Sequence, residues 1–419
     1  MAVDFKYLLQ GKHDCQCGRD HNCELKNIVL GSGALKELPA LAGGFNSILF
    51  VADNNTDALC GESVRILLGK KCRKELIYQT TGVLVPNEKA IAELDAMVTP
   101  EIDLIVGLGS GVINDLCKYA SFTHHIDYFI IATAPSMDGY ASCHAAMIIG
   151  GMKVTYSAHM AHSIIADVDI LRTAPEEMLR SGYGDILGKY SALNDWKLGH
   201  VMYDEYFCQN VYDLIYETTK GVEPIGRSLM QRDPEAVRLL MEAILVVGVA
   251  MSWIGNSRPA SGSEHHLSHF YEVLGLLNDT PYFLHGVNVA YSTVETELMR
   301  EEILALSSPA ASVNSMSRET EIRRVYGSAA EGVIELQNKA GWYEQDMLTL
   351  IQNKWDAIRD TLHEVPDSKW LIHCIESVGL SMDKYYAEYS DGERMDAKRW
   401  AKDLKDRYTF LWIWFMLLR

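Results

Sequence analysis

Four short apolar runs alternate with helical stretches between residues 25 and 170, and this alternation constrains the fold more than any other feature. The runs span residues 46–53, 74–80, 103–109 and 128–134. Each is rich in Ile and Val and apolar on both faces, which is typical of a parallel strand covered by helices. Alternation of such strands with helices predicts an α/β domain built on a parallel sheet.

The strand signals stop near residue 171, and helical periodicity continues from there almost to the end. Helix starts are marked at Thr173-Ala-Pro-Glu176, which has capping-box spacing, and at Asp233-Pro234-Glu235. A chain of 419 residues is long enough for two or three domains. We therefore expect an N-terminal extension (1–24), an α/β domain (25–171) and an all-helical domain (172–419).

Composition narrows the class of protein. Acidic residues outnumber basic ones by 56 to 38, and a net charge of −18 would repel a nucleic-acid backbone.

The N-terminus lacks the pattern of a secretory signal, which predicts a cytoplasmic protein, and nine scattered cysteines argue against a disulfide framework. The apolar run 241–255 is too short to span a membrane and predicts a buried helix. The apolar residues 410–418 indicate a buried helix end or an oligomer contact.

Glycines at 107, 109 and 111 follow the third apolar run and open a helix. Glycines at such a junction let the backbone approach a ligand, and the helix N-terminus favours a phosphate, so we predict a nucleotide pyrophosphate site. The spacing is not G-x-G-x-x-G, and the alternative is a tight turn without a ligand. Asp53, Thr133 and Ser136 end neighbouring runs and are predicted to face the same crevice, although Asp53 could equally be a helix N-cap.

The segment Ser261–Phe270 holds three histidines. His265 and His269 are four residues apart and share a helix face, whereas His266 points elsewhere. With His285, which precedes a glycine, and Asp185, an acid in an apolar helical pattern, His265 and His269 supply the candidate ligands of a divalent cation. One carboxylate and two imidazoles leave an open position on the metal, as a Lewis-acid catalyst requires. A polar turn or a solvated helix face is the alternative.

Five separated segments carry a family resemblance: GLGSGVIND, TAPSMDGYAS, SGYGDILGKYSALNDW, SRPASGSEHHLSHFYE and LHGVNVA. The residues of these segments and their order along the chain closely resemble those of the sn-glycerol-1-phosphate dehydrogenases. This family lies within the larger group of iron-type alcohol dehydrogenases, glycerol dehydrogenases and dehydroquinate synthases. The resemblance extends from about residue 25 to about residue 410. It implies a Rossmann-like NAD(P)-binding domain, a helical metal-binding domain and catalysis in the cleft between them.

The resemblance also implies roles for particular residues. Asp185, His265 and His285 match the metal ligands, which leaves His269 beside them or beside the nicotinamide. Lys189 stands where iron-type enzymes carry a fourth ligand, a histidine, and this departure favours Zn²⁺ or Ni²⁺ over Fe²⁺. The other implied contacts are Asp138 for a substrate hydroxyl and, for the cofactor, the loop residues Gly109, Ser110, Gly111, Asn114 and Asp115.

The implied reaction is the reversible reduction of dihydroxyacetone phosphate by NADH or NADPH to sn-glycerol 1-phosphate. We expect Asp138, His269 and Lys189 to act in catalysis, and Arg258, Lys197 and His200 to be candidates for the substrate phosphate. A homo-oligomer with a small phosphorylated substrate, and with no nucleic-acid or membrane partner, is expected. The alternatives are a glycerol dehydrogenase, a dehydroquinate synthase-type lyase and a nucleotide-binding protein without catalysis.

The N-terminal segment HDCQCGRDHNC contains Cys15, Cys17 and Cys23 with His13 and His21. A small zinc site is one interpretation of this segment. The spacing C-x-C-x₅-C is not that of a standard four-ligand site, so we treat the segment as an N-terminal extension.

Overall fold

The computed structural model describes residues 3–82, 84–149, 152–310 and 317–418. The chain divides into two compact units, neither of which is one continuous stretch. Unit 1 comprises residues 1–182 and 225–255, and unit 2 comprises residues 183–224 and 256–419. We expected one domain boundary near residue 171. The two units are instead interleaved along the chain, because residues 225–255, which follow the first part of unit 2, belong to unit 1.

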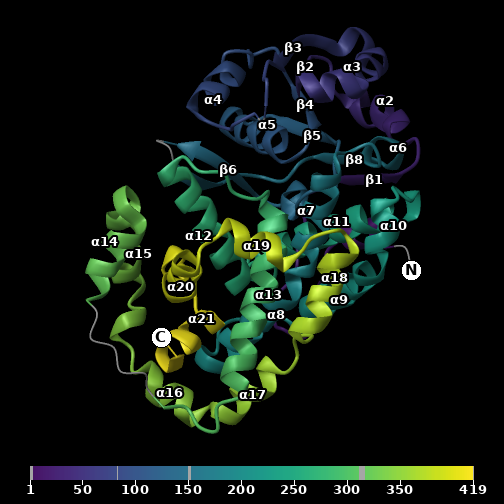
Figure 1. Cartoon of the computed structure of the whole chain (residues 1–419). Coiled ribbons are helices and arrows are strands. Elements are labelled where there is room, and N and C mark those ends of the chain that lie inside the picture. Colours follow the sequence, from purple (N-terminus) through teal and green to yellow (C-terminus); the bar gives the residue numbers. More distant parts are fainter. Residues whose placement is uncertain (1–2, 83, 150–151, 311–316, 419) are drawn as a thin grey trace. The chain divides into compact units, whose positions relative to one another are not determined.

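Unit 1 is built on a six-stranded sheet in which all paired strands are parallel. The strand order is β1-β8-β5-β4-β2-β3 (Figure 1). The bounds are β1 Asn27–Gly31, β2 Ile48–Asp53, β3 Cys72–Tyr78, β4 Leu104–Gly109, β5 Asp127–Ala132 and β8 Ser163–Asp167. The four predicted strands correspond to β2, β3, β4 and β5, and β1 and β8 extend the sheet beyond the prediction.

Helices cover both faces of this sheet. On one face, Phe50 of β2 and Val106 of β4 share a core cluster with Val64 of α3 (Asn54–Leu68). On the other face, α5 (Gly111–His124) packs so closely on β4 that an added Cβ at Gly107 would lie 2.9 Å from the Cys117 sulfur. The strand β3 lies on one side of β2, and β4 lies on its other side, so the order in which the chain adds strands reverses between β2 and β4. In open α/β sheets such a switch point is where the strand ends leave room for a ligand.

The remaining elements of unit 1 flank the sheet. They are α1 (Phe5–Leu9), α2 (Leu38–Leu41), α4 (Glu88–Asp95), the antiparallel pair β6 (His144–Ile149) and β7 (Met152–Ser157), α6 (Val168–Leu171), α10 (Gly226–Met230), α11 (Pro234–Ile254) and four short 3₁₀ turns among the described residues, of which η4 is Asp138–Ala141. Helix α11 begins where predicted, with the Asp233 side chain capping the Ala236 amide. By length and composition α11 could cross a membrane, but 78% of its apolar window is buried inside the protein.

Unit 2 contains only helices and short 3₁₀ turns over the part of the chain that the structure describes. Those used below are the end of α7 (Glu176–Leu187), α8 (Lys189–Tyr203), α9 (Gln209–Val222), α12 (Ser263–Asn278), α13 (His285–Leu304), α15 (Ala330–Ala340) and α21 (Phe410–Leu418). The others are α14 (Arg318–Tyr326), α16 (Met347–Asn353), α17 (Trp355–Leu362), α18 (Ser368–Ser377), α19 (Met382–Glu388) and α20 (Asp391–Trp400). The apolar run at 410–418 forms α21, which is buried. An α/β sheet domain followed by helices is thus the fold that was predicted.

Candidate functional site

Three helices of unit 2 bring one aspartate and two histidines together. Asp185 lies near the end of α7, His265 in the first turn of α12, and His285 at the first position of α13. One donor atom of each lies within 4.8 Å of the others. His265 Nε2 is 3.6 Å from Asp185 Oδ1, close to the separation of about 3.4 Å expected for an oxygen and a nitrogen on one tetrahedral zinc ion. The geometry suits a small divalent cation.

Each histidine of this group is oriented by a carboxylate through its other ring nitrogen. His265 Nδ1 is 2.6 Å from Glu264 Oε1, and His285 Nδ1 is 2.7 Å from Glu272 Oε1. A carboxylate on Nδ1 fixes the ring and leaves Nε2 as the metal-binding atom, an arrangement typical of metal-bound histidines. Both glutamates are buried, which is unusual for Glu unless it has such a partner.

The electrostatics of the site favour an ionised aspartate and neutral imidazoles. Burial alone would raise the pKa of Asp185, but the charge of Lys189 and the neighbouring imidazoles lower it below its ordinary value. Lys189 Nζ lies 2.7 Å from Asp185 Oδ1 and also donates to the Ala260 carbonyl at 3.1 Å. Burial, followed by the charge of Lys189, holds the pKa of His265 well below its ordinary value. These are the protonation states in which Asp and His bind a metal.

His269 lies beside this group on α12. Its ring centroid is 5.9 Å from that of His265 and 5.5 Å from that of His285. His269, Glu272 and His285 form a second set of donor atoms within 4.8 Å of one another, so His285 belongs to both sets. Because Glu272 already contacts Nδ1 of His285, the set with Asp185 leaves the better donor arrangement for a cation.

In unit 1, the carboxyl ends of β2 and β4 carry the residues predicted to bind a nucleotide. Gly109 ends β4, and Ser110 is the N-cap of α5 without a side-chain capping bond. Asp53 ends β2 and is itself the N-cap of α3, where it accepts from the amides of Asn55 (2.8 Å) and Thr56 (2.9 Å). The alternative reading of Asp53 as a helix cap therefore describes its contacts in this structure.

Other predicted cofactor residues lie in the same unit, where Asn114, Thr133 and Ser136 are buried. Thr133 donates its amide to the Gly109 carbonyl at 3.1 Å, which ties the end of β5 to the glycine loop. The Ser136 carbonyl accepts from the Ser181 hydroxyl at 2.9 Å. Asn114 is fully buried and reaches Asp115 and Gly139, and Asp115 accepts from the Ala146 amide at 3.2 Å. These contacts position the loop ends around the glycine loop.

Asp138 lies in η4, which Lys118 of α5 holds in place. Lys118 is fully buried, and its Nζ donates to the Gly139 carbonyl (2.8 Å), the His144 carbonyl (2.8 Å) and the Ser142 hydroxyl (3.2 Å). Burial lowers the pKa of Lys118. Lys118 was not predicted; its position one helical turn after Asn114 is the only hint in the sequence.

The three predicted phosphate ligands all have partners in unit 2. Arg258 makes a bidentate ion pair with Glu205, at 2.7 and 2.6 Å. Lys197 pairs with Glu364, and His200 contacts the Glu205 carbonyl at 2.8 Å. The structure does not bring Lys197 into the group around the metal ligands, and the charge of Arg258 is largely balanced.

Two other cations hydrogen-bond to the loop that precedes α12. Lys405 Nζ donates to the Ser261 hydroxyl at 2.9 Å, and Arg407 donates to the Ser261 carbonyl at 2.8 Å. The charge of Lys405 also contributes to the low pKa of His265. Both residues come from the far end of the chain, so no local spacing in the sequence connects them with His265.

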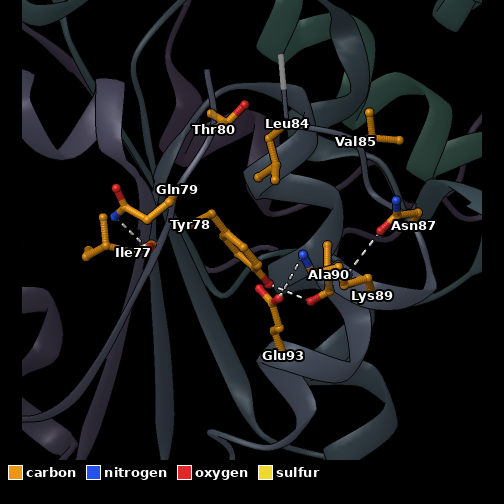
Figure 2. Close-up of a pocket in the computed structure, with 10 residues that line it drawn as sticks. All are labelled: Ile77, Tyr78, Gln79, Thr80, Leu84, Val85, Asn87, Lys89, Ala90 and Glu93. Atoms are coloured by element: carbon orange, nitrogen blue, oxygen red, sulfur yellow. Dashed lines mark hydrogen bonds and ion pairs between the residues drawn. The ribbon is translucent and has the colours of Figure 1, made fainter. Parts of the chain in front are cut away.

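Two pockets lie away from these residues. The first has a volume of about 370 Å³ at the carboxyl end of β3, and Figure 2 shows Tyr78 directed across it toward α4, where its hydroxyl donates to the Ala90 carbonyl at 2.7 Å. A second pocket, of about 270 Å³, lies beside α12 and Tyr389. Neither is lined by a predicted site residue. The glycine loop is therefore the candidate site of unit 1, and the Asp185 group is the candidate site of unit 2.

The described residues thus combine a parallel sheet with a glycine loop in unit 1 and an Asp-His-His group on the helices of unit 2. Residues 29–175 match the family described as iron-containing alcohol dehydrogenase. The alcohol dehydrogenase of Oenococcus oeni has the same fold, with a TM-score of 0.62 at 15% identity over 93% of this chain and 97% of that one. The glycerol dehydrogenase of Schizosaccharomyces pombe gives 0.54 at 15% identity over 92% and 93%.

Relatives that share 30% or more of their residues with this chain narrow the class further. A glycerol-1-phosphate dehydrogenase [NAD(P)+] of Halalkalibacterium halodurans is 30% identical over 95% of this chain and 94% of its own length. A protein of the same name from Hyperthermus butylicus is 32% identical over 65% of this chain and 78% of its own. The chain belongs to the glycerol-1-phosphate dehydrogenase family, whose members are oxidoreductases that act on CH–OH groups. The resemblance seen in the sequence is thereby confirmed.

Proposed function

We propose that this protein reduces dihydroxyacetone phosphate to sn-glycerol 1-phosphate, reversibly, with NADH or NADPH. One observation carries the proposal: Asp185 faces His265 Nε2, and His265 and His285 are each oriented by a buried glutamate. A catalyst for ketone reduction needs such a site for an electrophile, and membership of the family supplies the substrate class.

Asp185, His265 and His285 would hold one divalent cation. When bound, it would supply Lewis-acid stabilisation of the oxygen of the ketone, and the nicotinamide would supply the hydride. Lys189 occupies the position of a fourth ligand, but its ammonium group donates to Asp185 and cannot bind a metal. Three protein ligands, one oxygen and two nitrogens, favour Zn²⁺ or Ni²⁺ over Fe²⁺ in this proposal.

The protein's own residues manage charge and protons around the reacting ketone. Lys189 keeps Asp185 ionised and places a positive charge where negative charge develops on the substrate oxygen. His269, next to both ligand histidines, is our candidate to hold and donate the proton at a ring nitrogen. Asp138 would accept a hydrogen bond from a substrate hydroxyl.

Lys405 and Arg407 join Arg258 as proposed ligands of the substrate phosphate. Arg258 lies on the loop before α12, Lys405 and Arg407 donate to Ser261 of that loop, and the charge of Lys405 contributes to the low pKa of His265. A phosphate in a protein of net charge −18 needs such a local group of cations. We further propose that the pyrophosphate of the cofactor binds at the glycine loop, and that the protein is a cytoplasmic homo-oligomer without a nucleic-acid partner.

The test is a matrix of two cofactors and two substrates. We expect metal-replete protein to oxidise NADH or NADPH with dihydroxyacetone phosphate much faster than with dihydroxyacetone, and chiral analysis to find sn-glycerol 1-phosphate as the product. A preference for the unphosphorylated ketone would instead identify a glycerol dehydrogenase. No oxidation with either ketone would identify a nucleotide-binding protein without this activity.

A further inference from the structure

The N-terminal segment of unit 1 folds into a closed loop. Lys12 and His21 form an antiparallel bridge, with amide-to-carbonyl distances of 2.9 and 2.8 Å. Gly11 has a φ of +78°, and an added Cβ there would lie 2.1 Å from the His21 carbonyl oxygen, so only glycine fits. Inside the loop the Gly18 amide bonds to the Cys15 carbonyl at 2.9 Å, which forms a tight turn. This backbone brings Cys15, Cys17 and His21 together.

The donor atoms of these three residues lie within 4.8 Å of one another. Cys17 Sγ is 3.4 Å from His21 Nε2, and a sulfur and a nitrogen on one tetrahedral zinc ion are about 3.6 Å apart. Cys15 and His21 are buried, and Cys17 is partly buried. Cys23 lies outside the group, with its sulfur 3.9 Å from the sulfur of Met160.

His21 is oriented as a metal ligand would be. Its Nδ1 is 3.2 Å from the carbonyl oxygen of Trp253, and its ring stacks on the Trp253 indole at a centroid distance of 5.7 Å. Because a carbonyl only accepts, Nδ1 carries the proton, and Nε2 turns its lone pair toward Cys17. Fixing one ring nitrogen in this way is the common support of a metal-bound histidine.

We propose that Cys15, Cys17 and His21 bind a structural zinc ion, separate from the Asp185 group of unit 2. Two thiolates and an imidazole select a soft or borderline ion such as Zn²⁺ over Mg²⁺ or Ca²⁺. Structural zinc takes four ligands, so a further donor, either water or a side chain, completes the coordination. The ion fastens the N-terminal loop to α11, because His21 is held by Trp253 of that helix.

Cobalt substitution of the full-length protein tests this site without reference to activity. Thiolate ligands give Co²⁺ an intense charge-transfer absorption in the near ultraviolet, and the Asp185 group has no sulfur. We expect this band in the wild type and in H265A, its retention in the matched control C23S, and its loss in C17S. Native C17S should hold one zinc equivalent fewer than C23S by elemental analysis.

A second measurement needs no variant. In the zinc-loaded wild type, we expect mass spectrometry to find Cys15 and Cys17 protected from alkylation until a chelator is added, and Cys23 to alkylate at the same rate in both conditions. Absence of the charge-transfer band in the wild type would overturn the proposal and leave a simple thiol–imidazole hydrogen bond. Alkylation of Cys15 and Cys17 that is independent of zinc would overturn it as well.

Discussion

The two histidines on one face of α12 have different surroundings, and this difference predicts different effects of their removal. His265 faces the Asp185 carboxylate and is buried, whereas His269 is partly exposed and only flanks the other rings. We expect H265A to lose the metal and H269A to retain it while losing most of its activity. Metal content after gel filtration, measured together with turnover, checks this. Metal loss in H269A with retention in H265A would instead favour the set His269, Glu272 and His285.

Glu272 contacts His285 through Nδ1 and is itself buried. Replacement by Gln keeps the size of the side chain but removes the charge that orients and polarises the ring. We expect E272Q to bind metal about 10- to 100-fold more weakly, as measured by competition with a chelator. The control is E335Q, which changes an exposed glutamate of α15. Equal metal affinity in E272Q and the wild type would remove the support for His285 as a ligand.

The proposed role of Lys405 predicts that its removal impairs the reaction of the phosphorylated ketone specifically. If its charge binds the substrate phosphate, K405A should raise KM for dihydroxyacetone phosphate about tenfold or more, with little effect on turnover of dihydroxyacetone. Lys197, which pairs with Glu364, is the matched control, and K197A should change neither value greatly. An equal loss on both ketones in K405A would indicate a structural role through Ser261.

At the level of the elements, two glycines of the glycine loop differ in how much space their surroundings leave for a side chain. An added Cβ at Gly109 would lie 2.5 Å from Cβ of Ile113, which has no freedom to move, whereas at Gly111 the nearest atom is the flexible end of Met137 at 3.4 Å. We expect G109A to lower the free energy of unfolding by about 1–3 kcal/mol and G111A to cost much less. Urea denaturation of the two variants checks this. Equal midpoints would show that β4 and α5 can separate without cost.

The same elements show how far the sequence predicts the fold. The strands β2, β4 and β5 are continuous apolar runs, so their burial on both faces was visible in advance. Strand β1 is only partly buried, and β8 has five residues next to a histidine, so neither had the length or pattern that marks a strand. The two strands pair with each other, and β8 also pairs with β5; such pairing between distant segments is a long-range property.

The candidate site was predicted unevenly for a similar reason. Helical spacing and the family resemblance indicated Asp185, His265 and His285, but Glu264 and Glu272 had the appearance of ordinary helix-surface acids. Only packing reveals that both are buried against the histidines. Lys405 lies 140 residues after His265 in the sequence, and it reaches the loop before α12 only through the fold of unit 2.

For the whole molecule, a buried acid on α13 predicts how stability changes with pH. Burial, opposed by Arg300, raises the pKa of Glu297 from 4.5 to about 8. Between these values the native state keeps a proton that the unfolded state has lost. Stability should therefore fall by up to about 5 kcal/mol as pH rises from about 4.5 to about 8. E297Q should flatten this dependence, and E335Q should not, in urea denaturation at pH 5 and pH 8; parallel curves for E297Q and the wild type would contradict the prediction.

The division of the chain into units has a consequence for biosynthesis. The chain passes between the units three times, at residues 182, 224 and 255, and α11, which packs against α6, η4 and β1, is encoded after part of unit 2. A ribosome therefore releases η4, α6 and the edge strand β1 long before the helix that packs against them, and their apolar surface stays exposed until α11 is synthesised. We would look for chaperone dependence during translation, and for the failure of either unit to be produced as a continuous fragment.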